Sequence, residues 1–175
     1  MPPNRTMKIF LVGMLGSGKT TLGKQLAKHM DIPFVDMDWE ISNRENKSVQ
    51  EIFSQHGEDY FRNVEAEVLR ELSASSESFV VGTGGGAPCF YGGMDVINNA
   101  GLSVFLDVDV DELFSRLANA TDRPLLNSTD DEEKKKTLHA LRAQRLPVYS
   151  RAHITIETPT FQKLIDAVSK GKADR

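Results

Sequence analysis

Residues 13–20 read Gly13-Met14-Leu15-Gly16-Ser17-Gly18-Lys19-Thr20 and directly follow the apolar run Ile9-Phe10-Leu11-Val12. They match the pattern G-x-x-x-x-G-K-[ST], with a predicted strand before it and a predicted helix, residues 21–30, after it. In this setting glycines let consecutive backbone N–H groups turn inward toward phosphate oxygens, and the positive end of the helix dipole adds to the attraction. The alternative, a glycine-rich turn that matches by chance, does not account for the strand and the helix. The stretch predicts a P-loop that binds the phosphates of a nucleotide.

Two side chains of this loop have predicted roles of their own. We expect Lys19 to reach the outer phosphates and the Thr20 hydroxyl to bind Mg²⁺ directly. The residues expected to contact the nucleotide are Gly13, Leu15, Gly16, Ser17, Gly18, Lys19, Thr20 and Thr21.

Length and composition narrow the class of protein. The chain has 175 residues, the size of one domain, and it carries 21 basic and 25 acidic groups for a net charge of −4. This balance gives no support for binding nucleic acid, which needs clustered positive charge. The single cysteine, Cys89, excludes an internal disulfide and is expected to be inert. Because no apolar run approaches the length of a membrane span and the first residues are polar, we expect a cytoplasmic protein without a membrane segment.

Short apolar runs alternate with segments of helical spacing. The apolar runs predict strands at residues 8–12, 33–36, 78–82, 102–107 and 153–156. Strands that alternate with helices are typical of a parallel sheet that is covered on both faces. We therefore predict a single α/β domain over residues 1–175.

Two helices between these strands have clear signals. Phe61, Val64, Val68 and Leu72 recur at intervals of three and four, which places them on one face of a helix. A second helix is expected at residues 110–117, with Asp109 as its N-cap and Glu112 at the spacing of a capping box.

The polar, proline-containing segment at residues 118–130 interrupts this alternation. A loop of this length inside a compact domain is usually functional, and beside a phosphate site it predicts a lid. The acidic and basic run at residues 130–136 is expected to form a solvated helix face, with acidic residues in the first turn and lysines one turn later.

Two acidic residues follow the second predicted strand. Asp36 and Asp38 alternate along an extended segment, so both carboxylates are expected to face the cleft at the carboxyl end of the sheet. One of them is suited to holding a Mg²⁺-bound water and the other to accepting a proton from a substrate hydroxyl. The alternative is that one of them caps the next helix. Asp107 ends another strand but ranks below Asp36, because it leads directly into the Asp109 cap.

Arginines and glycines supply further candidates. Arg62 and Glu65 lie one turn apart on a helix, and Arg142 and Arg145 share another helix face on which Tyr149 follows. Each arginine is either a ligand-binding group or one partner of a surface ion pair. Three consecutive glycines, residues 84–86, expose bare backbone after a strand, which favours a turn that a substrate approaches closely.

Taken together, these segments resemble the shikimate kinase family. The resemblance spans about residues 8–156 in the family's order, and it rests on residues 13–21, Asp36-Met37-Asp38, Gly57-Glu58, Phe61-Arg62 with Glu65, Gly82-Thr83-Gly84-Gly85-Gly86, Arg123-Pro124-Leu125-Leu126 and Arg145-Leu146-Pro147-Val148-Tyr149. It implies a nucleoside-monophosphate-kinase-like three-layer sandwich with a five-stranded parallel sheet. Within that sandwich, it implies a substrate-binding helical region at about residues 37–72 and a mobile lid at about residues 118–130.

The resemblance also implies an activity and a set of roles. The activity is ATP-dependent phosphorylation of the 3-hydroxyl of shikimate, which gives shikimate 3-phosphate and ADP on the route to chorismate and the aromatic amino acids, with Mg²⁺ as the cofactor and a monomer as the active unit. Asp38 would bind shikimate hydroxyls and act as the base, and Asp36 would hold Mg²⁺ through water. Further implied contacts are Arg62, Arg145, Gly84, Gly85 and Gly86 to shikimate, Arg123 to the transferring phosphate and Arg116 to the adenine.

Two alternatives remain at this stage. A gluconate kinase of the same architecture would also bind a hydroxylated carboxylate, although the glycine triplet and the Asp-x-Asp pair favour shikimate. A nucleotide-binding module without catalysis is the second alternative. The segment after the last strand, residues 157–160, lacks the arginine that many family members have near the adenine.

Overall fold

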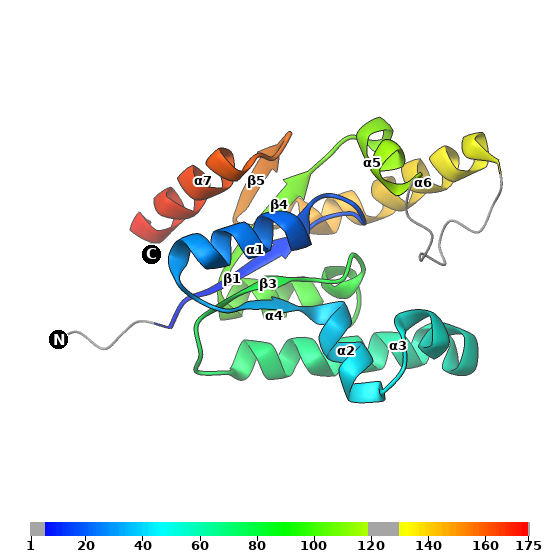
Figure 1. Ribbon diagram of the computed structural model, residues 1–175, viewed down its shortest axis with the longest axis horizontal. Helices are drawn as coiled ribbons and strands as arrows, with labels where there is room; N and C mark the ends of the chain where they lie inside the picture. The colour runs from blue at the N-terminus through cyan, green and yellow to red at the C-terminus, as the bar shows by residue number, and fades with distance from the viewer. Residues whose placement is uncertain (1–5, 119–129, 175) are drawn as a thin grey trace.

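The computed structural model describes residues 6–118 and 130–174, and its centre is a five-stranded sheet in which every described pairing is parallel (Figure 1). The strands are β1 (Lys8–Val12), β2 (Phe34–Asp36), β3 (Phe79–Gly82), β4 (Leu102–Asp107) and β5 (Ile154–Glu157), in the spatial order β2-β3-β1-β4-β5. All five predicted strands are present, each within one residue of its predicted ends.

The central strand β1 shows why the sheet needs cover on both faces. Its side chains are fully buried and alternate between two cores. Phe10 and Val12 belong to one hydrophobic cluster, and Ile9 and Leu11 belong to the other. Because successive residues of a strand point to opposite faces, a strand buried on both sides must be apolar throughout.

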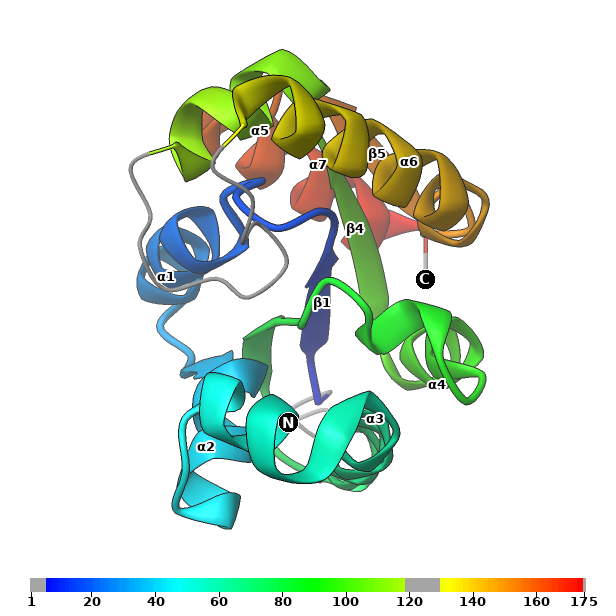
Figure 2. The ribbon, with the colours of Figure 1, turned by 90° about the vertical axis from the view of Figure 1, so that its right-hand side faces the viewer.

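Helices complete the two outer layers (Figure 2). On one face, α1 (Lys19–Met30) and α7 (Phe161–Ala173) pack Leu26 and Leu164 against the sheet. On the other face lie α3 (Val49–Ala74), α4 (Gly93–Ala100), α5 (Val110–Leu117) and α6 (Asp131–Tyr149). The predicted α/β three-layer fold is confirmed.

The predicted helix signals are also present. Helix α5 covers residues 110–117, and the Asp109 carboxylate accepts a hydrogen bond from the Glu112 backbone N–H, although the Glu112 carboxylate pairs with Arg116. Helix α1 begins at Lys19, two residues earlier than predicted. Between β2 and α3 lies a short helix, α2 (Met37–Glu45). The predicted lid lies outside the described residues apart from its ends, Ala118 and Asp130.

Helix α3 contains a corner. Gly57 has φ 83° and ψ 175°, a conformation that is essentially restricted to glycine, and two helical arms meet there. The first arm begins at a capping box formed by Ser48 and Glu51, and the second carries the predicted stripe, of which Phe61, Val64 and Val68 are buried. The corner turns the beginning of α3 relative to the long arm that lies along the core.

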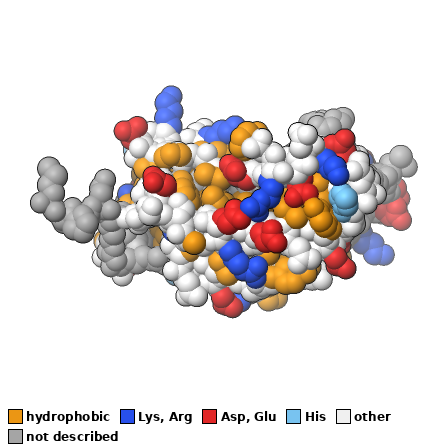
Figure 3. Space-filling model, turned by 90° about the horizontal axis from the view of Figure 1, so that it is seen from below, with side chains coloured by type: hydrophobic (Ala, Val, Ile, Leu, Met, Phe, Trp, Pro, Cys, Tyr) orange, Lys and Arg blue, Asp and Glu red, His pale blue; other side chains and the backbone are white. Residues whose placement is uncertain are grey.

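The surface mixes charges of both signs. Figure 3 shows acidic and basic side chains next to one another on one face of the molecule. On α2 and α3, for example, Arg44 bonds Glu71 at 2.5 Å and lies 3.8 Å from Glu67. Within residues 6–118 and 130–174, no helix is both long and apolar enough to cross a bilayer.

The distance between α1 and the sheet depends on Gly23. A Cβ atom at this position would overlap Cε2 of the Phe34 ring on β2 and would lie 3.2 Å from Leu11 Cδ1. We expect Gly23→Ala to lower the free energy of unfolding by about 1–3 kcal/mol, since overpacking outweighs the small gain in helix propensity. Urea unfolding measures the change.

The Phe34→Leu variant is the matched partner for this test. It removes the overlapping ring, so the cost of Gly23→Ala should be smaller in the double variant than in the wild-type background. Simple additivity of the two costs would show that the ring is not what excludes a side chain at position 23.

Candidate functional site

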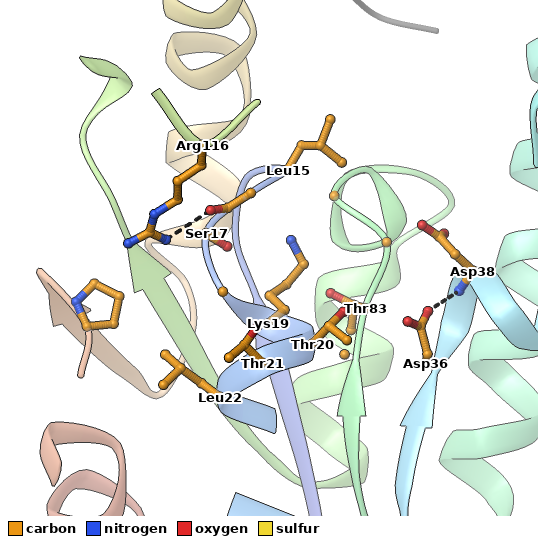
Figure 4. Close-up of a pocket in the computed structure, with 16 residues that line it drawn as sticks. Leu15, Ser17, Lys19, Thr20, Thr21, Leu22, Asp36, Asp38, Thr83 and Arg116 are labelled. Carbon is orange, nitrogen blue, oxygen red and sulfur yellow. Dashed lines mark hydrogen bonds between the residues drawn. The ribbon is translucent and has the colours of Figure 1, made fainter. Parts of the chain in front are cut away.

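The P-loop has the geometry of an anion-binding turn. Gly16 and Gly18 adopt positive φ angles of 78° and 97°, which a side chain would disfavour, and Gly18 is the N-cap of α1. The Lys19 ammonium folds over the loop and donates hydrogen bonds to the carbonyl oxygens of Gly13, at 2.7 Å, and Met14, at 2.8 Å. The loop, the lysine and the start of α1 therefore surround one small space (Figure 4).

A first cavity, of about 440 Å³, lies over this loop. The P-loop, the start of α1, the end of β2, the turn after β3, Arg116 of α5 and the loop after β5 all contribute to it. Its lining consists of Leu15, Gly16, Ser17, Gly18, Lys19, Thr20, Thr21, Leu22, Asp36, Asp38, Gly82, Thr83, Gly84, Gly85, Arg116 and Pro159. Of the predicted nucleotide contacts that the structure describes, all but Gly13 line this cavity.

Arg116, from α5, and Pro159, from the loop after β5, both line the first cavity. The Arg116 Nη1 donates to the Gly16 carbonyl oxygen at 3.0 Å and its Nε donates to Glu112 at 2.9 Å, so the side chain is fixed over the P-loop. Pro159 comes from the segment that lacks a family arginine, and Lys163 holds this segment by donating to the carbonyl oxygens of Glu157 and Thr158. This segment therefore contributes the apolar ring of Pro159 to the cavity, and not a charged side chain.

Asp36 and Asp38 both line the first cavity, as predicted, but for a different reason. The chain leaves the extended conformation at Met37, and the Asp36 Oδ1 caps α2 by accepting from the backbone N–H groups of Asp38, at 3.0 Å, and Trp39, at 3.3 Å. Asp38 thus belongs to the first helical turn rather than to an alternating strand. The alternative that one aspartate caps a helix is correct for Asp36, and it is compatible with a place in the cavity.

A second cavity, of about 330 Å³, adjoins the first. Both arms of α3, the turn after β3 and α6 enclose it. Its lining consists of Leu15, Asp38, Val49, Gln50, Phe53, Glu58, Phe61, Arg62, Glu65, Gly84, Gly85, Gly86 and Arg145. Leu15, Asp38, Gly84 and Gly85 line both cavities, so the two spaces meet at the Asp38 carboxylate and the first two glycines of the triplet.

Arg62 and Glu65 form an ion pair inside the second cavity. The Arg62 Nη1 donates to Glu65 Oε1 at 2.9 Å, and both residues are almost fully buried. Glu58 accepts from the Nε and Nη2 of the same guanidinium at 3.3 Å each. Burial raises the pKa of Glu65, while the charge of Arg62 opposes this shift. Among the described residues, these bonds leave one N–H on each Nη of Arg62 for a ligand.

The glycine triplet leaves room for these charged groups. A Cβ at Gly84 would lie 2.5 Å from Glu65 Oε2, and one at Gly85 would lie 2.9 Å from Arg145 Nη1. A Cβ at Gly86 would overlap the Arg62 guanidinium, with Cζ 2.6 Å away. The close approach that the structure shows is made by the site's own side chains, and contact of this turn with a substrate stays a prediction.

The two arginines of α6 have different surroundings. Arg145 is buried beside Gly85, and Tyr149, one turn later, donates its hydroxyl to the Gly85 carbonyl oxygen at 2.5 Å. Burial raises the pKa of Tyr149, so this hydroxyl stays protonated and acts as a donor. Arg142 instead bonds Asp107 at 2.7 Å, away from both cavities. Only Arg145 of the pair reaches the site.

The donors around the P-loop fit Mg²⁺ better than a metal that needs many protein ligands. Within the described parts of the chain, no group of three or more His, Cys, Asp or Glu residues is arranged to hold a metal ion. Mg²⁺ usually takes one or two protein oxygens and completes its shell with water and phosphate oxygens. Thr20 and Asp36 line the same cavity, and the Asp36 cap uses only Oδ1.

Some site residues are not evident from sequence patterns. The sequence indicates Glu65 as an ion-pair partner of Arg62 and as part of the family pattern, but not that it packs against Gly84 and lines the second cavity. Val49, Phe53 and Pro159 are apolar residues that the sequence does not distinguish from ordinary core residues. The corner in α3 brings Val49 and Phe53 to the second cavity, and the loop after β5 brings Pro159 to the first. Burial raises the pKa of Cys89, as expected of an inert thiol. Arg123 lies outside the described residues, so its role stays a prediction.

Comparison with known proteins agrees with this geometry. A family model described as shikimate kinase matches residues 15–169. A shikimate kinase of Bacteroides fragilis is 46% identical over 148 residues, which cover 84% of this chain and 82% of that protein. The crystal structure of shikimate kinase from Bacteroides thetaiotaomicron has a TM-score of 0.85 and 38% identity, covering 95% of this chain and 97% of that one. Shikimate kinase from Acinetobacter baumannii in complex with shikimate has a TM-score of 0.88 and 33% identity, covering 95% of each chain.

The bond between Tyr149 and Gly85 is open to a direct test. Tyr149→Phe removes the hydroxyl and leaves a partly buried carbonyl oxygen without this donor, so we expect the free energy of unfolding to fall by about 1–2 kcal/mol. Chemical denaturation measures it. The control is Tyr91→Phe, a half-exposed tyrosine whose hydroxyl loss should cost less than about 0.5 kcal/mol. Equal effects of the two changes would contradict a structural role for the bond between Tyr149 and Gly85.

Proposed function

The chain belongs to the shikimate kinase family, and on this premise we propose which of its groups perform the reaction. It is an ATP-dependent kinase that phosphorylates the 3-hydroxyl of shikimate and gives shikimate 3-phosphate and ADP, a step toward chorismate and the aromatic amino acids. The observation that carries the assignment of roles is the meeting of the two cavities at Asp38 and Gly84. One cavity is suited to a nucleotide and the other to a small hydroxylated acid.

ATP binds in the first cavity. The backbone N–H groups of the P-loop and the start of α1 cradle its phosphates, and Lys19 exchanges its bonds to the Gly13 and Met14 carbonyls for phosphate oxygens. Arg116 and Pro159 lie near the adenine end of the same cavity. Lys19 then neutralises charge on the phosphoryl group as it transfers, which is the main contribution that a protein makes to this reaction.

Shikimate binds in the second cavity with its carboxylate toward Arg62 and Arg145. Arginine grips a carboxylate with charge-assisted hydrogen bonds, and sheltered bonds of this kind are worth about 1.5–3 kcal/mol. The two remaining N–H groups on the Nη atoms of Arg62 support this role. Gly84, Gly85 and Gly86 line the second cavity with bare backbone beside these charged side chains, and the ring of shikimate lies against this turn.

Asp38 stands at the boundary of the two cavities, where the 3-hydroxyl would meet the terminal phosphate. Its carboxylate orients that hydroxyl and accepts its proton as the oxygen attacks phosphorus. The rest of the rate enhancement comes from holding the two substrates in line, since positioning alone supplies much of the barrier reduction in phosphoryl transfer.

Mg²⁺ is the proposed metal, with Thr20 as a direct ligand and Asp36 as a ligand through water. When bound, the ion neutralises the negative charge of the phosphates. The hydroxyl of Thr20 and the Oδ2 atom of Asp36, which takes no part in the cap, supply the hard donors that Mg²⁺ requires.

The surroundings of the enzyme are also part of the proposal. We infer a monomer, in keeping with the expectation from the sequence. We infer the cytoplasm, because the single, half-buried cysteine fits a reducing compartment.

A coupled ADP-release assay tests the activity itself. We expect turnover with shikimate and none above background with gluconate or nucleoside monophosphates. The Lys19→Ala variant is the control for adventitious ATPase activity, and its kcat should fall by about 100-fold or more with the fold retained. Turnover with gluconate alone would reject shikimate as the acceptor, and ATP binding without any turnover would favour a regulatory module.

The role of Arg62 predicts a selective defect. Arg62→Ala should raise the KM for shikimate by about 10–100-fold and leave the KM for ATP within about twofold, because Arg62 lines the proposed acid cavity and not the nucleotide cavity. Steady-state kinetics with each substrate varied in turn measures both constants. The matched control is Arg44→Ala, which removes a surface arginine with its own glutamate partners. An unchanged KM for shikimate in Arg62→Ala would remove this residue from the acid site.

The two roles of Asp36 can be separated by one substitution. Asparagine caps helices as well as aspartate does, so Asp36→Asn should leave the unfolding midpoint almost unchanged. Loss of the charge should weaken metal use, so the Mg²⁺ concentration for half-maximal activity should rise about tenfold. Titration of activity with Mg²⁺ measures this shift, and an unchanged titration would limit Asp36 to capping α2.

A further inference from the structure

We propose that Phe90 is a positioning residue for the acid-binding arginine: its ring holds the Arg62 guanidinium in its binding orientation. The guanidinium carbon of Arg62 lies over the Phe90 ring, 4.3 Å from its centroid. Phe90 lines neither cavity, so it acts through Arg62 rather than on a substrate. The inference rests on the proposed role of Arg62 and adds the element that fixes this side chain.

The other partners of Arg62 leave this function open. Glu58 and Glu65 accept from N–H groups at the edges of the planar guanidinium, so they restrain it within its plane. Glu58 is also largely exposed, and its two bonds are long at 3.3 Å. The motion that remains is a tilt of the guanidinium out of its own plane. The Phe90 ring, which lies against the guanidinium, restrains this tilt. The Phe61 ring lies farther away, at 5.4 Å.

The chemistry of the contact suits this task. An aromatic face carries partial negative charge and attracts a cation, and the attraction grows when the cation is removed from water. Arg62 is only 6% exposed, so water screens its charge weakly. Arginine also stacks on aromatic rings with its flat face, which leaves its N–H edges available to carboxylates.

The backbone fixes Phe90 relative to the glycine triplet. Residues 87–89 form a 3-10 helix in which the Cys89 N–H donates to the Gly86 carbonyl oxygen at 2.9 Å. Phe90 then begins a tight turn, closed by a bond of 3.0 Å from the Gly93 N–H to the Phe90 carbonyl oxygen. The two central residues of the turn, Tyr91 and Gly92, have φ angles of 50° and 69°, as expected of a type I′ turn. The ring is therefore attached to the same backbone segment that the acid is proposed to contact.

The test compares side chains that keep the ring with side chains that keep only its apolar volume. Phe90→Leu and Phe90→Met should each raise the KM for shikimate about 3–10-fold, with the KM for ATP unchanged. Phe90→Tyr and Phe90→Trp retain an aromatic face and should stay within about twofold of the wild type. Tyr91→Leu is the matched control, since it removes the neighbouring ring, and the rings found over the Arg62 guanidinium among the described residues are those of Phe61 and Phe90. Thermal unfolding of each variant verifies that the fold is retained.

A double variant shows whether Phe90 acts through Arg62. In the Arg62→Ala background, Phe90→Leu should have no further effect on the KM for shikimate. If Arg62→Ala raises this KM but the Leu and Met variants do not, or if Tyr and Trp fail to rescue it, the inference about Phe90 is overturned and the role of Arg62 stands. If Arg62→Ala itself has no effect, the proposed acid site fails, and the inference fails with it.

Discussion

Three charged side chains, Arg62, Glu65 and Arg145, are buried against bare backbone, and the organisation of the acceptor cavity depends on keeping them so. A buried charge is costly unless it is paired and hydrogen-bonded. Here the arginines and the glutamate compensate one another across the glycine triplet, where no Cβ separates them from the main chain. The N–H groups that remain on Arg62, together with the neighbouring Arg145 guanidinium, provide a place for an organic acid. Glycine is therefore required at residues 84–86 because charged side chains pack closely against the backbone there, and not because of the backbone angles.

Much of this arrangement could be predicted from the sequence because the signals are local. An apolar run followed by glycines and a helix start predicts the P-loop, and alternation of short strands with helices predicts the parallel sheet. The same order of elements brings Asp38 and Gly84 to the carboxyl ends of neighbouring strands β2 and β3. A parallel sheet, and hence a site at the carboxyl ends of its strands, follows from these patterns, whereas the structure supplies the order of the strands.

Contacts between distant segments could not be predicted in the same way. The sequence shows that Tyr149 follows Arg145 by one helical turn, but not that its hydroxyl meets the Gly85 carbonyl, 64 positions earlier. Arg142 and Arg145 share a helix face, and only the packing of α6 against β4 assigns one to Asp107 and the other to the site. Asp36 and Asp38 were expected to alternate on a strand, whereas a helix begins between them. Such details depend on tertiary packing, which local propensity does not encode.

The corner at Gly57 gives the acceptor cavity a wall made by folding one helix on itself. Val49 and Phe53 precede the corner, Phe61 and Arg62 follow it, and all four line the same cavity. The backbone angles at this corner are accessible to glycine almost alone, so the position is closed to gradual mutational change. The residues on the two arms are under no such restriction. A directed-evolution campaign that seeks a new acceptor would find its useful diversity on the arms and would have to leave the corner as it is.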